Sequence, residues 1–358
     1  MNKITKLRNV MKRESIDCLA IVPGPNLYYI TSKKFHLSER PVVFFVEQDD
    51  LTFVLPELES QKLAGLDVNS LTYSDVTGPS PAFDNFFKNK NFKKVGVESR
   101  LMRHLELNLI SNDCEKIIDS TQIFAGLRTI KSDYEISMIE EAVSIAEKSI
   151  NSVIHKLTSG ISEKEFASEL VIQLLKSGSE SELPFSPIVA SGVNAANPHH
   201  FPTDKLIAKD ELVIIDWGAN HQSYFSDITR TFATGKRIHP KLLNAFESVK
   251  LANLAAREKS AHGVAAGDVD LAARSVIDER GFGDFFVHRT GHGLGLEIHE
   301  EPNIKQKDEF ILNEGNIYTI EPGIYLPNLG GIRIEDDVLI HSSGCRSLTT
   351  LPRGLVYL

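Results

Sequence analysis

Carboxylates stand at the ends of two apolar, β-branched runs in the second half of the sequence. Residues 213–215 run into Asp216, and Asp227 follows eleven residues later within residues 224–232, which are rich in aromatic and β-branched side chains. A turn-like stretch separates the two runs, so an antiparallel hairpin would bring both carboxylates to one face of neighbouring strands. Taken alone, the pair could instead be a surface ion pair between Asp227 and Arg230, with Asp216 as a cap.

A second pair of acids repeats this arrangement, and a histidine lies between the two pairs. Glu321 ends an apolar run, and Glu335 follows 14 residues later within residues 331–337. His292 stands among three glycines in residues 291–295, and glycine allows the backbone to approach a bound group closely. Four inward carboxylates together with this imidazole favour a metal site over a packing role.

The charge of such a site is balanced by two divalent cations, because four carboxylates carry four negative charges. Oxygen-rich ligation with one imidazole suits Mn²⁺, Co²⁺, Fe²⁺ or Zn²⁺ better than a metal selected by thiolates. Two such ions can hold a bridging water whose pKa falls to about 7, so that hydroxide forms at neutral pH, and a metal also polarises the carbonyl under attack. The residues therefore predict metal-dependent hydrolysis.

At these positions the sequence resembles the metallopeptidases of the pita-bread fold, especially Xaa-Pro dipeptidases (prolidases) and aminopeptidase P. The order Asp, Asp, His, Glu, Glu, the Gly-His-Gly-x-Gly loop around His292 and the Ile-Glu-Pro-Gly turn at Glu321 carry this resemblance. It implies that a hydroxide bridging two metal ions, with manganese favoured, hydrolyses the peptide bond before proline in a di- or oligopeptide. The near alternative is an Xaa-Pro aminopeptidase that acts on longer peptides.

The resemblance also implies a role for each ligand. Asp227 and Glu335 would bridge both ions, Asp216 would bind one ion, and His292 with Glu321 would bind the other. Glu321 would in addition be the proton shuttle, since a carboxylate beside the nucleophilic water can take its proton and pass it to the leaving nitrogen.

Three further histidines match family positions that contact substrate or stabilise the tetrahedral intermediate, and an arginine is a further candidate. The catalytic candidates are His288, His299 and His199, and the substrate-binding candidates are His199, His299 and Arg333. A well-placed donor to a developing oxyanion contributes on the order of 2.7–4 kcal/mol. Arg333 alternates with its neighbours two residues before Glu335, so we expect it on the same face, where it could orient that carboxylate. An exposed loop position for His199 and a plain salt bridge for Arg333 are the alternatives.

One position departs from the family pattern. Several prolidases carry an arginine directly after the His-Glu-x-Pro turn that holds the C-terminal carboxylate of a dipeptide, whereas this chain has Asn303. Lys305, Lys307 or a partner-subunit residue could supply the charge, so the choice between dipeptidase and aminopeptidase stays open. Residues 35–41 resemble a loop that reaches the other subunit's site in some relatives, which agrees with a homodimer, although a surface connection is the alternative.

Three other functions occur to us for a chain with these residues: a methionine aminopeptidase, a binding protein and a lyase. A methionine aminopeptidase has the same five ligands but usually consists of a catalytic domain alone. Binding proteins of this fold typically lose ligands, whereas this chain keeps all five. A metal-dependent lyase is not distinguished from a peptidase by the sequence.

The elements that must position these residues divide the chain into two domains. Residues 1–125 have a helical period near the start, followed by apolar runs at 18–22, 42–46 and 51–55, of which the last two have the signature of a hairpin. This predicts a small α/β domain, which the resemblance identifies as the creatinase/prolidase-like N-terminal type. Residues 126–358 would form the pita-bread (creatinase/aminopeptidase-like) catalytic domain, and the predicted fold class is α+β.

Two capping boxes begin the second domain. Ser132 and Ser162 each precede a glutamate by three residues, which is the signature of a helix start. The second helix would carry an apolar face. Its predicted members are Phe166, Leu170, Ile172 and Leu174.

Composition limits the class of protein. The 358 residues include 39 Lys+Arg and 48 Asp+Glu, a net charge of −9, and this acidic balance without a basic stripe argues against a nucleic-acid partner. Three separated cysteines predict neither a disulfide framework nor a thiolate zinc site. We find no apolar run near the ~18 residues that cross a bilayer and no signal-peptide core, so we expect a cytoplasmic protein without membrane contact.

Overall fold

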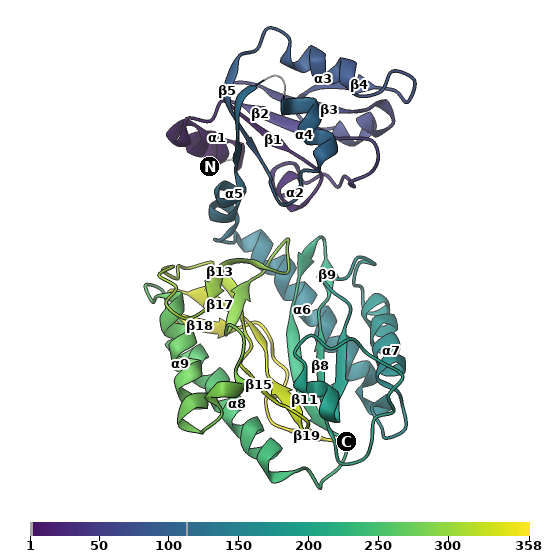
Figure 1. Ribbon diagram of the computed structural model, residues 1–358, viewed down its shortest axis with the longest axis vertical. Helices are drawn as coiled ribbons and strands as arrows, with labels where there is room; N and C mark the ends of the chain where they lie inside the picture. The colour runs from purple at the N-terminus through teal and green to yellow at the C-terminus, as the bar shows by residue number, and fades with distance from the viewer. Residues whose placement is uncertain (1–2, 112–113) are drawn as a thin grey trace. The chain divides into compact units, whose positions relative to one another are not determined.

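In the computed structural model, which describes residues 3–111 and 114–358, the chain folds into two units, Met1–Arg128 and Thr129–Leu358 (Figure 1). Each unit has hydrophobic clusters of its own. None of the helices within the described ranges is both long enough and apolar enough to span a membrane.

A mixed six-stranded sheet forms the centre of the N-terminal unit, in the order β4-β3-β2-β1-β5-β6. Its strands are β1 (Cys18–Ile21), β2 (Val43–Glu47), β3 (Leu51–Pro56), β4 (Asn69–Tyr73), β5 (Phe92–Val97) and β6 (Cys114–Asp119). The β2–β3 pair is antiparallel with Val46 opposite Leu51, which confirms the predicted hairpin. The β1–β5, β3–β4 and β5–β6 pairs are parallel.

Helices accompany both faces of this sheet. They are α1 (Lys3–Glu14), α2 (Pro25–Thr31), α3 (Ser80–Phe87), α4 (His104–Ile110) and α5 (Thr121–Arg128), with a 3₁₀ helix at Glu57–Leu63. Side chains alternate between the faces of a strand, and in β1 Cys18 and Ala20 enter one hydrophobic cluster while Leu19 and Ile21 enter another. The sheet is therefore covered on both faces, as the apolar runs of an α/β domain require.

Two pairs of helices enclose the strands of the C-terminal unit. They are α6 (Asp133–Val153), α7 (Glu163–Lys176), α8 (Pro240–Lys259) and α9 (Ala266–Glu279). In Figure 1, α7 lies on one side of the strands, and α8 and α9 lie on the other; α6 packs against α7. Both predicted capping boxes form, at Ser132 and at Ser162.

One residue that was predicted to lie on the buried apolar face of α7 does not lie there. Phe166, Leu170 and Leu174 are buried, but Ile172 is 43% exposed. Ile172 follows Leu170 by two residues, which turns its side chain about 200° around the helix axis. It therefore points away from the face that packs.

Two sheets and two short hairpins carry the predicted site residues. One sheet has the order β19-β11-β8-β7 and the other has the order β13-β12-β14-β17-β18. The strands are β7 (Ile188–Ser191), β8 (Leu212–Trp217), β9 (Asn220–His221), β10 (Tyr224–Phe225), β11 (Ile228–Ala233), β12 (Gly291–Gly293), β13 (Glu300–Ile304), β14 (Ile317–Ile320), β15 (Gly323–Leu326), β16 (Gly330–Arg333), β17 (Asp336–His341), β18 (Gly344–Ser347) and β19 (Val356–Tyr357). Three 3₁₀ helices complete the unit, at Ile154–Lys156, Gly192–Ala196 and Gly283–Phe285.

The two acid-bearing strand pairs are antiparallel and share one design. β8 pairs with β11, and the hairpin β9–β10 lies between them in the sequence. β14 pairs with β17, and the hairpin β15–β16 lies between them. Packing against the helices holds both pairs; for example, the buried indole of Trp217 donates a 3.0 Å hydrogen bond to the carbonyl of Ala146 in α6.

The continuous strands predicted for residues 224–232 and 331–337 are each broken at the acid. Asp227 lies between β10 and β11, and Glu335 lies between β16 and β17. The backbone N–H of Asp227 donates to the side chain of Asp337 at 3.0 Å, and that of Glu335 donates to the carbonyl of Thr229 at 3.0 Å. These donors bond across to the other half of the unit, so the two halves meet at the acids.

Candidate metal centre

A cavity of about 480 Å³ in the C-terminal unit collects every residue that the sequence analysis singled out as a site residue. They are Asp216, Asp227, His292, Glu321, Glu335, His288, His299, His199 and Arg333. The strand ends and the glycine-flanked loop, which are far apart in the sequence, therefore line the same cavity.

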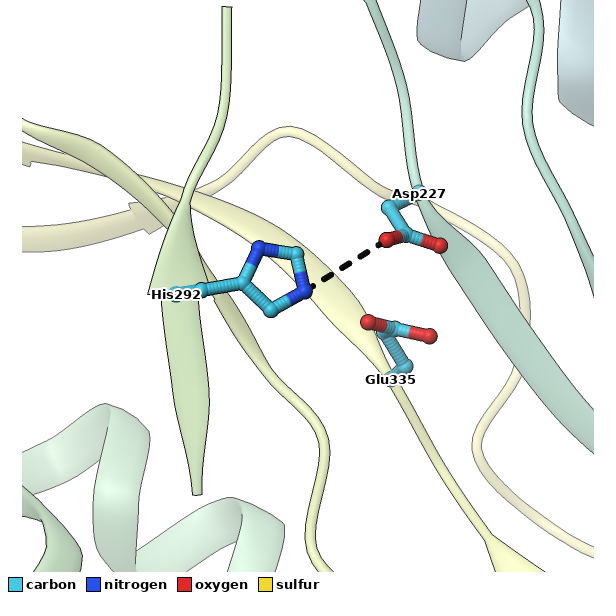
Figure 2. Close-up of side chains that lie close together, drawn as sticks. All are labelled: Asp227, His292 and Glu335. Atoms are coloured by element: carbon cyan, nitrogen blue, oxygen red, sulfur yellow. Dashed lines mark ion pairs between the residues drawn. The ribbon is translucent and has the colours of Figure 1, made fainter. Parts of the chain in front are cut away.

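Asp227, His292 and Glu335 form a compact group in this cavity (Figure 2). Each offers one ligand atom, and these atoms lie within 4.8 Å of one another. Asp227 precedes β11, His292 lies in β12 and Glu335 precedes β17, so three separate segments contribute. Asp216 and Glu321 line the same cavity beside this group.

The imidazole of His292 turns a lone pair toward the carboxylates. Its Nδ1 lies 3.1 Å from the carbonyl oxygen of Gly293, which can only accept, so Nδ1 carries the proton and Nε2 is bare. Nε2 lies 3.6 Å from an oxygen of Asp227 and 3.4 Å from an oxygen of Glu321. Burial, together with the charges of His299 and Arg289, holds the pKa of His292 well below its usual range, so protonation does not relieve these contacts.

Asp216 is held on one side and left open on the other. Its Oδ2 accepts a 2.6 Å hydrogen bond from Nη2 of Arg333, whereas its buried Oδ1 has no hydrogen-bond partner among the described residues. The guanidinium thus bonds Asp216 directly, and it reaches Glu335 only through the hydroxyl of Thr229. Arg333 and Glu335 line the same cavity, as expected, and the link by which Arg333 could orient Glu335 is the hydroxyl of Thr229.

The remaining carboxylates are crowded and poorly solvated. Burial, followed by repulsion from neighbouring acids, raises the pKa of Asp227 and of Glu335 well above the usual range of a carboxyl group. Burial also raises the pKa of Glu321, against the opposing charge of Arg333. Unpaired carboxylates cost several kcal/mol each when buried, so this arrangement is unfavourable for the protein alone.

These features fit a bound cation. A bare imidazole nitrogen faces carboxylate oxygens that have too few hydrogen-bond donors, and one buried oxygen of Asp216 has none. Bound divalent metal ions would satisfy these groups, because imidazole and carboxylate are ligands that Mn²⁺, Co²⁺, Fe²⁺ and Zn²⁺ accept.

His288 is less available than the sequence suggested. Its Nδ1 lies 2.7 Å from the carbonyl oxygen of Arg289, and its Nε2 lies 2.9 Å from the hydroxyl of Tyr325. Tyr325 in turn accepts from Nη1 of Arg333 at 2.8 Å. Burial lowers the pKa of His288 to about 4, so the ring is neutral at pH 7 and both of its nitrogens are already engaged.

The other two histidines are more accessible. The ring of His299 lies edge-on to His292 with 4.4 Å between their centroids, and burial lowers the pKa of His299. His199 is exposed on the loop that follows the 3₁₀ helix Gly192–Ala196, and its backbone N–H donates to the side chain of Asn197 at 3.1 Å. Both can therefore meet a ligand that enters the cavity.

Among the polar residues of the cavity wall that sequence reasoning missed are Tyr325 and Arg289. Tyr325 lies in a short hairpin strand, and it reaches the cavity through its hydroxyl contacts with His288 and Arg333. No local motif marks either residue, although the position of Arg289 directly after His288 was a signal that could have been used.

Comparisons with known proteins extend over the whole chain. An Xaa-Pro dipeptidase of Pyrococcus horikoshii is 36% identical over 365 residues, which cover 99% of this chain and 98% of that protein. The crystal structure of a dipeptidase from Pyrococcus horikoshii matches with a TM-score of 0.94 at 35% identity, covering 99% of this chain and 100% of that one. An X-Pro aminopeptidase from Thermotoga maritima matches with a TM-score of 0.86 at 29% identity, covering 100% of each chain.

Family models match both units. Residues 3–130 match the creatinase/prolidase N-terminal domain, and residues 137–342 match metallopeptidase family M24. These matches, together with the structural likeness, confirm the predicted α+β class, in which a small N-terminal α/β domain precedes a pita-bread catalytic domain. The chain belongs to metallopeptidase family M24 and is a peptidase of a family that uses divalent metal ions.

Proposed function

We propose that this metallopeptidase hydrolyses the peptide bond that precedes proline, as an Xaa-Pro dipeptidase. The observation that carries the proposal is the convergence of five predicted metal ligands in one cavity, where their lone pairs face one another without enough protons or cations. The relative named Xaa-Pro dipeptidase, with 36% identity along almost the whole chain, supports the choice of substrate.

The proposed metal site holds two divalent ions. Asp227 and Glu335 would contact both ions, Asp216 would bind one, and His292 with Glu321 would bind the other. The 3.4 Å approach of His292 Nε2 to Glu321 supports the last pairing. When bound, the ions supply Lewis acidity and lower the pKa of a bound water; manganese is the metal that we expect.

The chain's own residues would then transfer protons and hold the metal ligands and the substrate in position. Glu321 would take a proton from the attacking water and donate it to the leaving proline nitrogen. Arg333 keeps Asp216 in place, and the hydroxyl of Thr229 keeps Glu335 in place. His299 and His199, which line the cavity, would donate hydrogen bonds to the scissile carbonyl as negative charge develops on its oxygen.

The proposed substrate also agrees with simple chemistry. The bond before proline is a tertiary amide without an N–H group, so a protease that binds its substrate through that donor handles it poorly. None of the hydrogen-bonding roles assigned above to the cavity residues uses this donor. A cavity of about 480 Å³ has the size of a small-ligand site.

An assay with four peptides tests the proposal. The purified protein is stripped of metal, reloaded separately with Mn²⁺, Co²⁺, Zn²⁺ or Fe²⁺, and offered Ala-Pro, Met-Pro, Arg-Pro-Pro and Met-Ala-Ser. We expect metal-dependent cleavage of Ala-Pro and Met-Pro, fastest with Mn²⁺. Cleavage of Met-Ala-Ser, with none of the three proline-containing peptides cleaved, would contradict the proposed specificity for the bond before proline.

Xaa-Pro aminopeptidase activity on longer peptides is the second candidate. The match to the X-Pro aminopeptidase of Thermotoga maritima over the full length of both chains favours it. Cleavage of Arg-Pro-Pro at least as fast as Ala-Pro would establish this candidate in place of the dipeptidase. We also propose a homodimer, which light scattering of the purified protein would test.

A further inference from the structure

The cavity contains two guanidinium groups, and only one of them is saturated by the protein. All three side-chain nitrogens of Arg333 bond to side chains in the C-terminal unit. Arg289 also lines the cavity and is partly buried. Within the described part of the chain its guanidinium makes a single hydrogen bond, from Nη1 to the side-chain oxygen of Asn303. A guanidinium has five N–H donors, so most of those of Arg289 are available to a ligand.

A short relay of side chains holds Arg289. Asn303 lies opposite His292 in the pairing of β12 with β13. Its amide nitrogen donates to Oε2 of Glu301 at 2.9 Å, and its backbone N–H donates to the same oxygen at 3.1 Å. A carboxylate oxygen only accepts, so the amide nitrogen must face Glu301 and the amide oxygen must face Arg289. The guanidinium is therefore fixed at one nitrogen and open at the others.

This arrangement suits an anionic ligand. No carboxylate of residues 3–111 or 114–358 forms an ion pair with Arg289, although four acidic side chains line the same cavity. A planar guanidinium binds a carboxylate through two parallel N–H donors, which gives both strength and orientation. The guanidinium of Arg289 thus has N–H donors left over for the carboxylate of a ligand.

We propose that Arg289 binds the C-terminal carboxylate of a two-residue substrate and so makes the enzyme selective for free dipeptides. This inference rests on the proposed function, because it takes the scissile bond to lie at the metal ligands. Arg289 precedes His292 by three residues, so their Cα atoms are at most about 11 Å apart. A dipeptide whose carbonyl lies at the ligands can then present its carboxylate to the long arginine side chain.

The inference predicts a difference between substrates that differ only in that carboxylate. Ala-Pro and alanyl-prolinamide share the scissile bond, but the amide lacks the negative charge. A hydrogen-bonded charge pair is worth on the order of 10- to 100-fold in kcat/KM. The wild-type enzyme should therefore prefer Ala-Pro by about this factor. A longer peptide, which has a peptide bond at the same place, should resemble the amide.

Substitutions of Arg289 test whether this residue causes the preference for Ala-Pro over alanyl-prolinamide. Arg289→Met should abolish the preference by raising KM for Ala-Pro, with alanyl-prolinamide unaffected, and Arg289→Lys should retain part of it. The matched control is Arg237→Met, which removes the same charge from a side chain that is 84% exposed and paired with Asp210 outside the cavity. This control should keep the full preference.

Equal loss on both substrates in Arg289→Met, or no loss on either, would overturn the inference while leaving Xaa-Pro cleavage intact. If the wild-type enzyme cleaves neither substrate, the proposed function fails, and calorimetric binding of L-proline against L-prolinamide decides the inference separately. Tighter binding of proline that disappears in Arg289→Met supports it. Equal binding of the two compounds contradicts it.

Discussion

The hydroxyl of Thr229 donates a 2.6 Å hydrogen bond to the carboxylate of Glu335, although 106 residues separate the two in the sequence. The same hydroxyl accepts a 3.1 Å hydrogen bond from Nε of Arg333, which also bonds Asp216. One small side chain thus connects the acids of both strand pairs. Hydrogen bonds of this kind orient metal ligands and adjust their basicity.

Replacement of this hydroxyl should weaken metal binding without unfolding the protein. Thr229→Val keeps the branched shape but leaves Glu335 and Arg333 without their shared partner. We expect metal affinity to fall on the order of 10- to 100-fold, measured by calorimetric titration of the stripped protein with Mn²⁺. Thr229→Ser keeps the hydroxyl and is the matched control. Equal affinities in wild type and Thr229→Val would show that the contact does not support the site.

Glu321 should separate metal binding from turnover. Glu321→Gln keeps the size of the side chain and one oxygen, but it cannot carry a proton from water to the leaving nitrogen. We expect a loss of kcat on the order of 10²- to 10⁴-fold with an unchanged circular dichroism spectrum. Metal content is measured in parallel, so that a loss of the ion is not mistaken for a loss of proton transfer. Kinetics like those of the wild type would refute the assigned role.

Glu163 predicts how stability depends on pH. Burial raises its pKa, but hydrogen bonds from His200, Ser191 and Thr203 outweigh this and lower it to about 2. Since the folded pKa lies below the ordinary 4.5, the ionised group stabilises the fold above about pH 4.5, and this contribution is lost as the pH falls toward 2.

Urea denaturation between pH 2 and pH 7 measures this dependence. The wild-type protein should lose stability across the acidic window, and Glu163→Gln, which does not titrate, should lose less over the same window while being less stable at pH 7. Parallel profiles for the two proteins would contradict the contribution assigned to Glu163.

Much of the site could be predicted because only a few residue types can bind a metal ion. A carboxylate at the end of an apolar run, such as Asp216 or Glu321, has few structural explanations, and the glycines around His292 narrow them further. These residues share one cavity, as the hairpin interpretation required. The helix starts at Ser132 and Ser162 followed from local hydrogen bonds, which depend on residues only three apart.

What the sequence could not predict depends on contacts between distant segments. The backbone donors of Asp227 and Glu335, where the predicted strands break, bond to the opposite half of the unit, which no local pattern reveals. The link from Arg289 to Asn303 is similar, since it joins the loop before β12 to β13 through side chains alone. At position 303 the sequence lacks the arginine of several prolidases. In the structure, Asn303 instead accepts a hydrogen bond from the guanidinium of Arg289.

Metal stoichiometry tests the central claim most directly. The stripped protein is reconstituted with excess Mn²⁺, desalted and analysed by inductively coupled plasma mass spectrometry, beside an Asp227→Asn, His292→Ala double variant. The proposed dinuclear centre predicts close to two ions per wild-type chain and a clear loss in the variant. Wild-type protein that retains no metal, or a variant that retains as much as the wild type, would contradict the assignment of these residues as metal ligands.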